Sequence, residues 1–393
     1  MRWASALTLF GTLLLMSLGL VMIASVGDVP GRVLHHDASH FLRSQAMFDA
    51  VALAGCAVIA CTRPRFWFKR ATVIALGAVV VLSLVVVHVP GLGRTVNGSA
   101  RWIRLPGISL QPSEFVKIAA IVLLAWWLGG DEKRAGTFKL GALVPCAGLG
   151  LTMGGFLLQP DLGSCVMLGA VAAAMMFAGG VKIRHLAPLG LVAALALGAF
   201  LVRDAERMSR ITSVLGHGSN REKVVAISED EDGYQLRMGL SAFAAGGATG
   251  VGLGKSLFKE RYLPENHTDF IFAMVGEELG LAATLPCLAL YAALAAAGFV
   301  IAYGAPNARQ RLLALGMTLQ ICLSAVVNVG VVTGFFPTKG LALPFLSYGG
   351  SSLVGSVGAA GFLMAIGWRP GARKPARRPE RARRRTVTDI WTG

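Results

Sequence analysis

Long apolar segments alternate with short polar segments along the whole chain. An α-helix needs about 20 predominantly apolar residues to cross the hydrocarbon core of a bilayer, and most of the apolar segments have about that length. The pattern therefore predicts an all-α polytopic membrane protein with about ten transmembrane helices. In the eighth segment we expect the helix proper to begin near residue 280. The expected spans are residues 5–25, 46–62, 71–89, 113–129, 140–158, 164–180, 186–202, 270–303, 311–335 and 350–368.

The composition agrees with this pattern. Of the 393 residues, 54% are hydrophobic and 15% are charged, whereas a soluble domain is typically about 45–50% apolar and about 25% charged. The first apolar segment follows Arg2 and is too long for the apolar part of a signal peptide, so we expect it to remain as a span. We expect residues 1–368 to form a single transmembrane domain.

Basic residues are distributed unevenly along a chain with a net charge of +16. They gather in the loops after the second, fourth, sixth and eighth spans and in the tail, residues 369–393. Short cytoplasmic loops carry an excess of Lys and Arg, so ten spans place both termini in the cytoplasm. The tail is rich in Pro and Arg, and we expect it to be disordered. No groove-reading motif accompanies the charge, which disfavours nucleic-acid binding.

The opposite, extracytoplasmic side then holds four longer segments, residues 26–45, 90–112, 203–269 and 336–349. The loop 203–269, between the seventh and eighth helices, is much the longest. Loops beyond about 12–15 residues are usually functional or disordered. This loop is not of low complexity and contains RMGLSAFAAGG, which we expect to form a small amphipathic or re-entrant piece. We therefore expect any chemistry to face outward.

Ionisable residues inside spans cost about 2.5–3.5 kcal/mol each on insertion scales and usually mark function. Arg101 lies at an outer interface, and Glu114 and Lys117 lie at the start of the fourth span. Ser113 is the expected cap of that helix. Glu114 and Lys117 are three residues apart and can pair on one face. The sequence leaves open whether they form a structural pair or bind an anionic substrate.

Two further outer segments contain turn residues. Residues 159–164, QPDLGS, predict a tight turn with Asp161 as a helix cap. Residues 333–353 contain Pro337 and Pro344 and cannot form one continuous helix. Irregular backbone at membrane depth is tolerated only where it is buried in protein or lines a cavity. Its amides and hydroxyls are suited to phosphate or sugar, and the polar candidates there are Lys339, Ser347, Tyr348, Ser351 and Ser352.

The segment LPENHTDFIFAMVGEELG, residues 263–280, passes from polar to apolar and carries four carboxylates, those of Glu265, Asp269, Glu277 and Glu278. Asp269 is either the N-cap of a helix that begins at Phe270 or a functional carboxylate at the mouth of the apolar run. A capping role for Asp269 does not explain why His267 lies beside it. For Glu277 and Glu278 we favour structural pairing with Lys or Arg from neighbouring spans.

Two other motifs resemble binding sites, but we interpret them as structural. Residues 247–256, GATGVGLGKS, resemble a phosphate-binding loop, yet Thr249 stands where that motif requires glycine. We expect flexible or closely packed glycine backbone there. In HHDASH, residues 35–40, His36 and His40 are four apart, but no third ligand is evident, so a solvated loop is favoured over a zinc site.

Four segments, in this order, resemble the SEDS family of bacterial wall synthesis: ARWIRLPGISLQPSEFVKI, YQLRMGLSAFAAGG, GVGLGKSLFKERYLPENHTDFIFAMVGEELGL and GFFPTKGLALPFLSYGGSSL. The PTKG and LPFLSYGGSS motifs are similar to the division-type branch of the family rather than the elongation-type branch. The resemblance implies a peptidoglycan glycosyltransferase that polymerises lipid II outside the cytoplasmic membrane. The leaving group would be undecaprenyl pyrophosphate.

The resemblance also implies roles for residues and partners. Asp269 matches the family's essential aspartate, and Lys117 and Lys339 match proposed substrate contacts. We expect Asp269 to act as general base or as a ligand of a divalent cation, Mg or Mn, with no organic cofactor. The implied partners are a class B penicillin-binding protein and other division proteins at the septum. The alternatives are a lipid II flippase and a non-catalytic division scaffold. The remaining substrate-binding candidates are Glu114, Arg101, His267, Ser347, Tyr348, Ser351 and Ser352.

Overall fold

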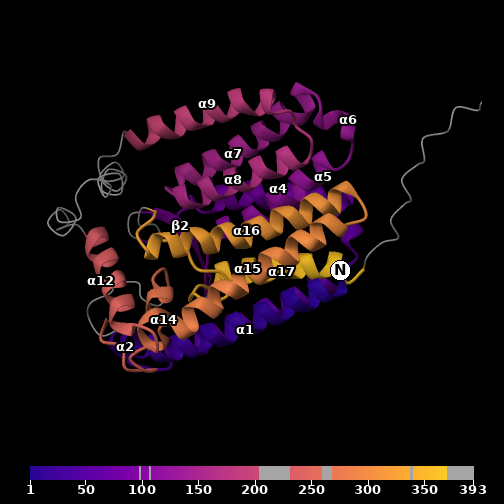
Figure 1. Cartoon of the computed structure of the whole chain (residues 1–393). Helices are drawn as coiled ribbons and strands as arrows, with labels where there is room; N and C mark the ends of the chain where they lie inside the picture. Colours follow the sequence, from indigo (N-terminus) through magenta and orange to yellow (C-terminus); the bar gives the residue numbers. More distant parts are fainter. Residues whose placement is uncertain (97–98, 106–107, 203–230, 259–267, 337–339, 370–393) are drawn as a thin grey trace, which may run out of the picture.

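The computed structural model describes residues 1–96, 99–105, 108–202, 231–258, 268–336 and 340–369, and within them a helix forms in each predicted span (Figure 1). Seven of the described helices are long and apolar enough to cross a membrane, and α4 and α8 are shorter apolar helices. The protein is therefore a multi-pass membrane protein, as predicted. The main helices are α1 Arg2–Val26, α3 His40–Cys61, α4 Arg70–Val86, α5 Pro112–Leu128, α7 Val144–Leu158 (extended at its start by a π-helical turn, Phe138–Leu143), α8 Leu162–Ala178, α9 Ile183–Val202, α15 Leu281–Gly304, α16 Ala308–Val332 and α17 Gly350–Gly367.

Shorter helices occupy the connections. In the long loop, the expected amphipathic piece is helix α12, Glu231–Gly246. The eighth span is divided at Gly280, whose φ of 69° ends the short helix α14, Ile271–Leu279, before α15 begins. The predicted start near residue 280 is thus confirmed, but residues 271–279 form a helix of their own. The other short elements are α2 Asp28–His35, the 3₁₀ helix Pro64–Phe68 and α6 Glu132–Ala135.

The all-α prediction is wrong for the outer segment 90–112, which folds as a three-stranded antiparallel sheet. The strands are β1 Gly93–Val96, β2 Ser99–Leu105 and β3 Ile108–Leu110, in the order β1-β2-β3. Ile103 of β2 pairs with Gly93 on one side and Leu110 on the other. The sequence SARWIRL alternates between polar and apolar side chains, which is the period of a strand, but it is short and lies between two strongly apolar spans.

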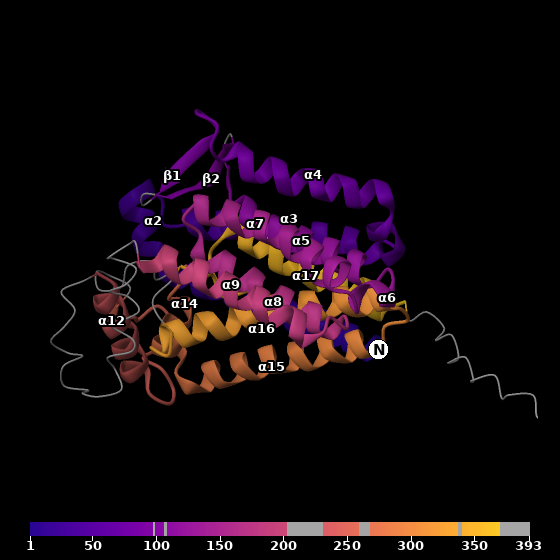
Figure 2. The same cartoon turned by 90° about the horizontal axis from the view of Figure 1, so that it is seen from above.

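Close helix contacts in the core depend on small residues. Helix α17 packs against α3 and runs in the same direction, since Gly350 lies at Phe48 and Gly361 at Cys56. Figure 2 shows α17 in the middle of the bundle. A Cβ added at Gly361 of α17 would lie 3.1 Å from the carbonyl oxygen of Cys56 on α3. Small residues let helix backbones approach closely in membrane bundles, and Gly361, in the run SSLVGSVGAAG, does so here.

The loops that carry basic residues meet at one end of the helix bundle. Arg369 donates to the carbonyl of Cys61 at 2.7 Å, and the Arg309 guanidinium lies 6.0 Å from the Phe68 ring centroid. Gly304 packs against the side chain of Met1. In Figure 1 this end carries the N-terminus, whereas α2, α12 and α14 lie at the opposite end. The candidate residues described below lie on the segments at that opposite end.

Candidate active site

Asp269 lies in a turn at the start of α14 and is half-buried. The predicted helix cap is wrong in detail, because the N-cap position is Phe270 and no side chain caps the helix. The carboxylate instead lies beside Gly340, the last residue of PTKG. A Cβ added at Gly340 would lie 2.8 Å from Asp269 Oδ2. Two motifs that are about 70 residues apart in sequence therefore meet at this carboxylate.

Asn328 of α16 joins the same two motifs, and sequence reasoning missed it. Its Nδ2 donates to the carbonyl oxygens of Asp269 at 2.8 Å and of Leu341 at 2.7 Å. Asn328 is 1% exposed. A single amide side chain in the apolar run VVNVGVV was the available signal, because polar groups buried in membrane helices are retained where they bind a partner.

We expect Asn328→Leu to weaken the site without unfolding the bundle. The change preserves side-chain size but leaves two buried carbonyl groups without their donor, which costs about 1–3 kcal/mol of stability. The activity of the site should fall about tenfold, because a small misplacement of a reacting group is costly. Thermal unfolding and an activity assay measure both effects. Unchanged activity together with a lowered unfolding temperature would contradict the positioning role.

Ser347 connects the third outer segment to the Asp269 turn. Its hydroxyl donates to the carbonyl of Thr268 at 2.6 Å and accepts from the amide of Leu343 at 2.8 Å. Ser347 is 3% exposed. The hydroxyl is thus used within the protein, and its contact with substrate stays a prediction. The segment is irregular as predicted, and Phe345 has a positive φ of 70°.

The neighbouring candidates also bind protein groups. The Tyr348 hydroxyl donates to Ser44 of α3 at 3.1 Å. The Ser351 hydroxyl accepts from the amide of Gln111 at 2.8 Å. Ser352 is half-buried in the first turn of α17. These bonds tie the start of α17 to α3 and α5, so Tyr348 and Ser351 shape the site instead of presenting free hydroxyls.

Glu114 and Lys117 form the predicted ion pair on α5. Lys117 Nζ lies 2.9 Å from Glu114 Oε1, and the two side chains are 3% and 13% exposed. Ser113 is not the cap that the sequence indicated, because the helix begins one residue earlier, at Pro112, after Gln111. The pair is nearly removed from solvent, which strengthens its attraction and also raises its desolvation cost.

Arg101 is held by the QPDLGS turn. Its guanidinium donates to the carbonyl oxygens of Gln159, at 3.1 Å, and of Pro160. Asp161 caps α8 by accepting from the amide of Ser164 at 3.1 Å, as predicted. A Cβ on Gly163 would lie 3.1 Å from Leu341. Arg101 thus joins the sheet to the QPDLGS turn. Gly163 in turn packs against Leu341, the residue after PTKG.

Two predicted site residues, His267 and Lys339, lie outside the described residues. Among the residues that are described, no group of three His, Cys, Asp or Glu side chains could hold a metal. Magnesium commonly binds through one or two carboxylates together with substrate phosphates. Asp269 fits that manner of binding as a single carboxylate, and the divalent cation stays a prediction.

The HHDASH segment and Glu277, for which we predicted structural roles, bind other groups of the protein. In the HHDASH segment, Asp37 accepts from the hydroxyl and amide of Ser39 and pairs with Arg43. These hydrogen bonds lower the pKa of Asp37. Glu277 binds the hydroxyl of Ser256 and the amide of Leu257, so the prediction of a Lys or Arg partner is wrong for Glu277 among the described residues.

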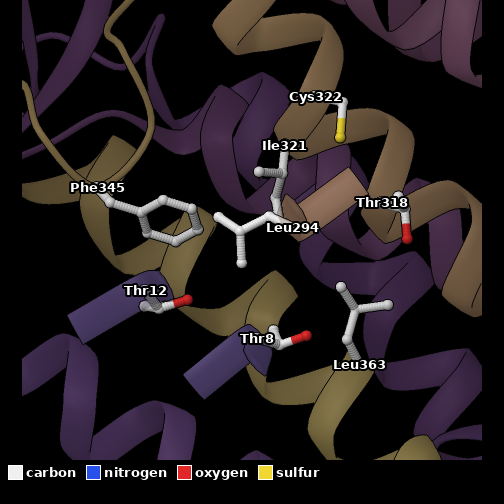
Figure 3. A pocket seen from close by; sticks show the side chains of 8 residues that line it. All are labelled: Thr8, Thr12, Leu294, Thr318, Ile321, Cys322, Phe345 and Leu363. Atoms are coloured by element: carbon white, nitrogen blue, oxygen red, sulfur yellow. The ribbon is translucent and has the colours of Figure 1, made fainter. Parts of the chain in front are cut away.

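A separate gap lies between α1, α15, α16 and α17 (Figure 3). It is too narrow to hold a water molecule. Two of its hydroxyls are used within their helices, since Thr8 donates to Ala4 and Thr318 donates to Ala314. No carboxylate, amine or guanidinium lines it, so it offers nothing for acid–base chemistry. Its lining residues are Thr8, Thr12, Leu294, Thr318, Ile321, Cys322, Phe345 and Leu363.

A family model described as a cell cycle protein, which covers FtsW, RodA and SpoVE, matches residues 5–369. The chain belongs to the FtsW/RodA/SpoVE family. The resemblance to the SEDS proteins is thereby confirmed, and the match extends over nearly all of the described helices.

Individual members of the FtsW/RodA/SpoVE family are similar over most of their length. The chain is 39% identical to the probable peptidoglycan glycosyltransferase FtsW of Trichlorobacter lovleyi, over 90% of each chain. It is 38% identical to the FtsW of Legionella pneumophila, over 86% of this chain and 84% of that one. It is 37% identical to the stage V sporulation protein E of Bacillus subtilis, over 90% and 94%.

Solved structures agree with the fold. A chain of a peptidoglycan synthase complex, described as coordinating polymerization and crosslinking, superposes with a TM-score of 0.71 and 27% identity over 92% of this chain and 96% of that chain. The rod shape determining protein RodA of Thermus thermophilus superposes with a TM-score of 0.66 and 25% identity, over 93% and 97%.

Proposed function

We propose that the protein is a peptidoglycan glycosyltransferase that polymerises lipid II on the outer face of the membrane, with Asp269 as general base. The observation that carries the proposal is the convergence on Asp269. Gly340 leaves room for its carboxylate, and Asn328 holds the backbone of both segments. The assignment as an enzyme is also supported by relatives that bear the name probable peptidoglycan glycosyltransferase.

The reaction needs a base and a stabilised leaving group. The 4-hydroxyl of the acceptor sugar gives its proton to the Asp269 carboxylate while its oxygen bonds to the anomeric carbon of the donor. The bond from that carbon to the pyrophosphate oxygen breaks, and undecaprenyl pyrophosphate leaves with the electron pair. An α-linked donor gives a β-linked product in one displacement, so no covalent enzyme intermediate is required.

Positive charge near the site stabilises the departing pyrophosphate. Lys117 is the described candidate, because it is a buried cation on α5 and its ion-pair partner is Glu114. A buried ammonium interacts strongly with a developing anion, since little water screens it. Lys339 is the second candidate. A divalent cation held by Asp269 would add charge neutralisation at the pyrophosphate.

We place this enzyme in the bacterial cytoplasmic membrane at the division septum. The basic loops gather at the end that carries the N-terminus, which supports a cytoplasmic assignment for that end and an outward-facing Asp269. A class B penicillin-binding protein is the proposed partner. The similarity to a chain of a complex that coordinates polymerization and crosslinking supports such a transpeptidase.

The test is polymerisation of fluorescent lipid II by the purified protein together with its transpeptidase partner. We expect glycan chains on gels that disappear when a muramidase is added. A parallel assay measures lipid II crossing the bilayer of liposomes that contain the protein. Crossing without glycan synthesis would replace the transferase with the flippase, and neither activity, from a folded complex, would favour the scaffold.

A further inference from the structure

Helix α14 carries Asp269 at one end and a buried carboxylate at the other. Asp269 precedes the helix by two residues, and Glu277 lies in its last turn, about 12 Å further along at 1.5 Å per residue. Residues 271–278 are all buried, at 2% exposure or less for every apolar side chain among them. A displacement of the far end of this short helix is therefore transmitted to Asp269.

The glycine-rich segment 247–256 lies alongside the break between α14 and α15. It provides backbone partners for carbonyls and amides that the break leaves outside a helix. Gly280 allows the close approach, because a Cβ there would lie 2.7 Å from the carbonyl oxygen of Ala248. The four bonds are Val251 N to Glu277 O at 2.9 Å, Gly252 N to Glu278 O at 3.0 Å, Leu281 N to Gly247 O at 3.1 Å, and Ala282 N to Ala248 O at 3.0 Å.

The Glu277 side chain continues this contact beyond the backbone. Its Oε1 accepts from the amide of Leu257 at 2.7 Å and from that of Phe258 at 3.4 Å. Its Oε2 accepts from the hydroxyl of Ser256. The side chain is fully buried, and charge-assisted bonds to amides and a hydroxyl are what such a carboxylate requires. Its partners among the described residues all belong to one stretch of chain, residues 256–258.

We propose that Glu277 is a positioning residue for the transferase reaction. By holding residues 256–258 it fixes the far end of α14, and thereby keeps the Asp269 carboxylate in register with Gly340 and Asn328. The inference rests on the proposed role of Asp269. Glu278 contributes a different anchor, because it accepts from the hydroxyl of Ser25 on α1 at 2.6 and 2.7 Å.

Three substitutions separate positioning from charge. Glu277→Gln keeps the length and one acceptor for the Leu257 amide but removes the charge. Glu277→Asp keeps the charge but shortens the reach by one methylene, and Glu277→Ala removes both. We expect kcat to stay within about twofold for Gln and to fall about tenfold or more for Asp and Ala, with KM for lipid II little changed, as for a misplaced reacting group.

Amide hydrogen exchange of the peptide 247–258 reports the anchor independently of activity. We expect protection to persist in Glu277→Gln and to be lost in Glu277→Asp. An active Asp variant beside an inactive Gln variant would overturn the proposal, because charge would then be the requirement. The proposal would also be overturned if all three variants had the wild-type kcat. It would equally be overturned if Glu277→Asp lowered kcat but left the amide protection of residues 247–258 unchanged.

Asp269→Asn, measured beside these variants, separates a failure of the proposed base from a failure of the proposed role of Glu277. If that variant were fully active, the proposed base would be wrong, whereas the exchange data would still decide whether Glu277 holds residues 256–258. If Glu277→Ala does not fold, the comparison between the Gln and Asp variants remains, since each preserves a polar side chain at this position.

Discussion

Asp269→Asn should reduce glycan synthesis from lipid II by about 10²–10⁴-fold, the usual contribution of a general base. Asparagine has nearly the same shape as aspartate but cannot take the proton from the acceptor hydroxyl. The backbone carbonyl of residue 269 still accepts from Asn328, so the fold should be retained. The measurement is the initial rate of polymerisation by the purified complex, with wild type and variant at equal concentration.

The controls for Asp269→Asn test its folding and its assembly with the transpeptidase partner. Both proteins should elute as one species, unfold at similar temperatures and bind the transpeptidase partner equally. A variant that polymerises as fast as wild type would remove Asp269 from the chemistry. Binding of lipid II should change little, because the base acts on the proton in the transition state.

Gly340→Ala should lower activity about 10–100-fold while leaving stability nearly unchanged. The new methyl group would lie 2.8 Å from Asp269 Oδ2, which is too close for a carbon–oxygen contact. The carboxylate is the end of a side chain and can rotate away, so the backbone need not move. Yet a shift on the order of 1 Å in a reacting group can cost about 100-fold in rate.

Gly148→Ala is the matched control, because a Cβ there meets no atom within 4 Å. We expect that variant to retain wild-type activity. Both proteins are compared by rate and by unfolding temperature. A Gly340→Ala protein with normal kinetics would show that Asp269 tolerates displacement and would weaken the assignment of its carboxylate as the base.

The sequence was sufficient for elements with a strong, long-range pattern. The apolar runs predicted the helices, and the i,i+3 spacing of Glu114 and Lys117 predicted their ion pair. The cap at Asp161 was also predictable, because an Asx cap is a local interaction. Such features depend on neighbours in the chain, and a single sequence contains that information.

Features that depend on distant partners were not predictable. The hydroxyl of Ser347 binds the carbonyl of Thr268, a partner 79 residues away in the chain that the sequence did not indicate. The single amide in VVNVGVV indicated that Asn328 binds a partner, but nothing in that segment identifies Asp269 and Leu341 as the partners. The three-stranded sheet was missed for a different reason, because its strands are short and β propensity is strongly context-dependent.

The break at Gly280 has a consequence for biosynthesis. At 1.5 Å per residue, α15 alone is about 36 Å long and matches a bilayer core of about 30 Å with some tilt. Helix α14 is only about 14 Å long by the same rise and carries two acids, each of which is costly to insert into lipid. It is therefore suited to assembly after translocation, by docking onto α1 and the glycine-rich segment. The order in which these pieces emerge favours this, because both are synthesised before α14.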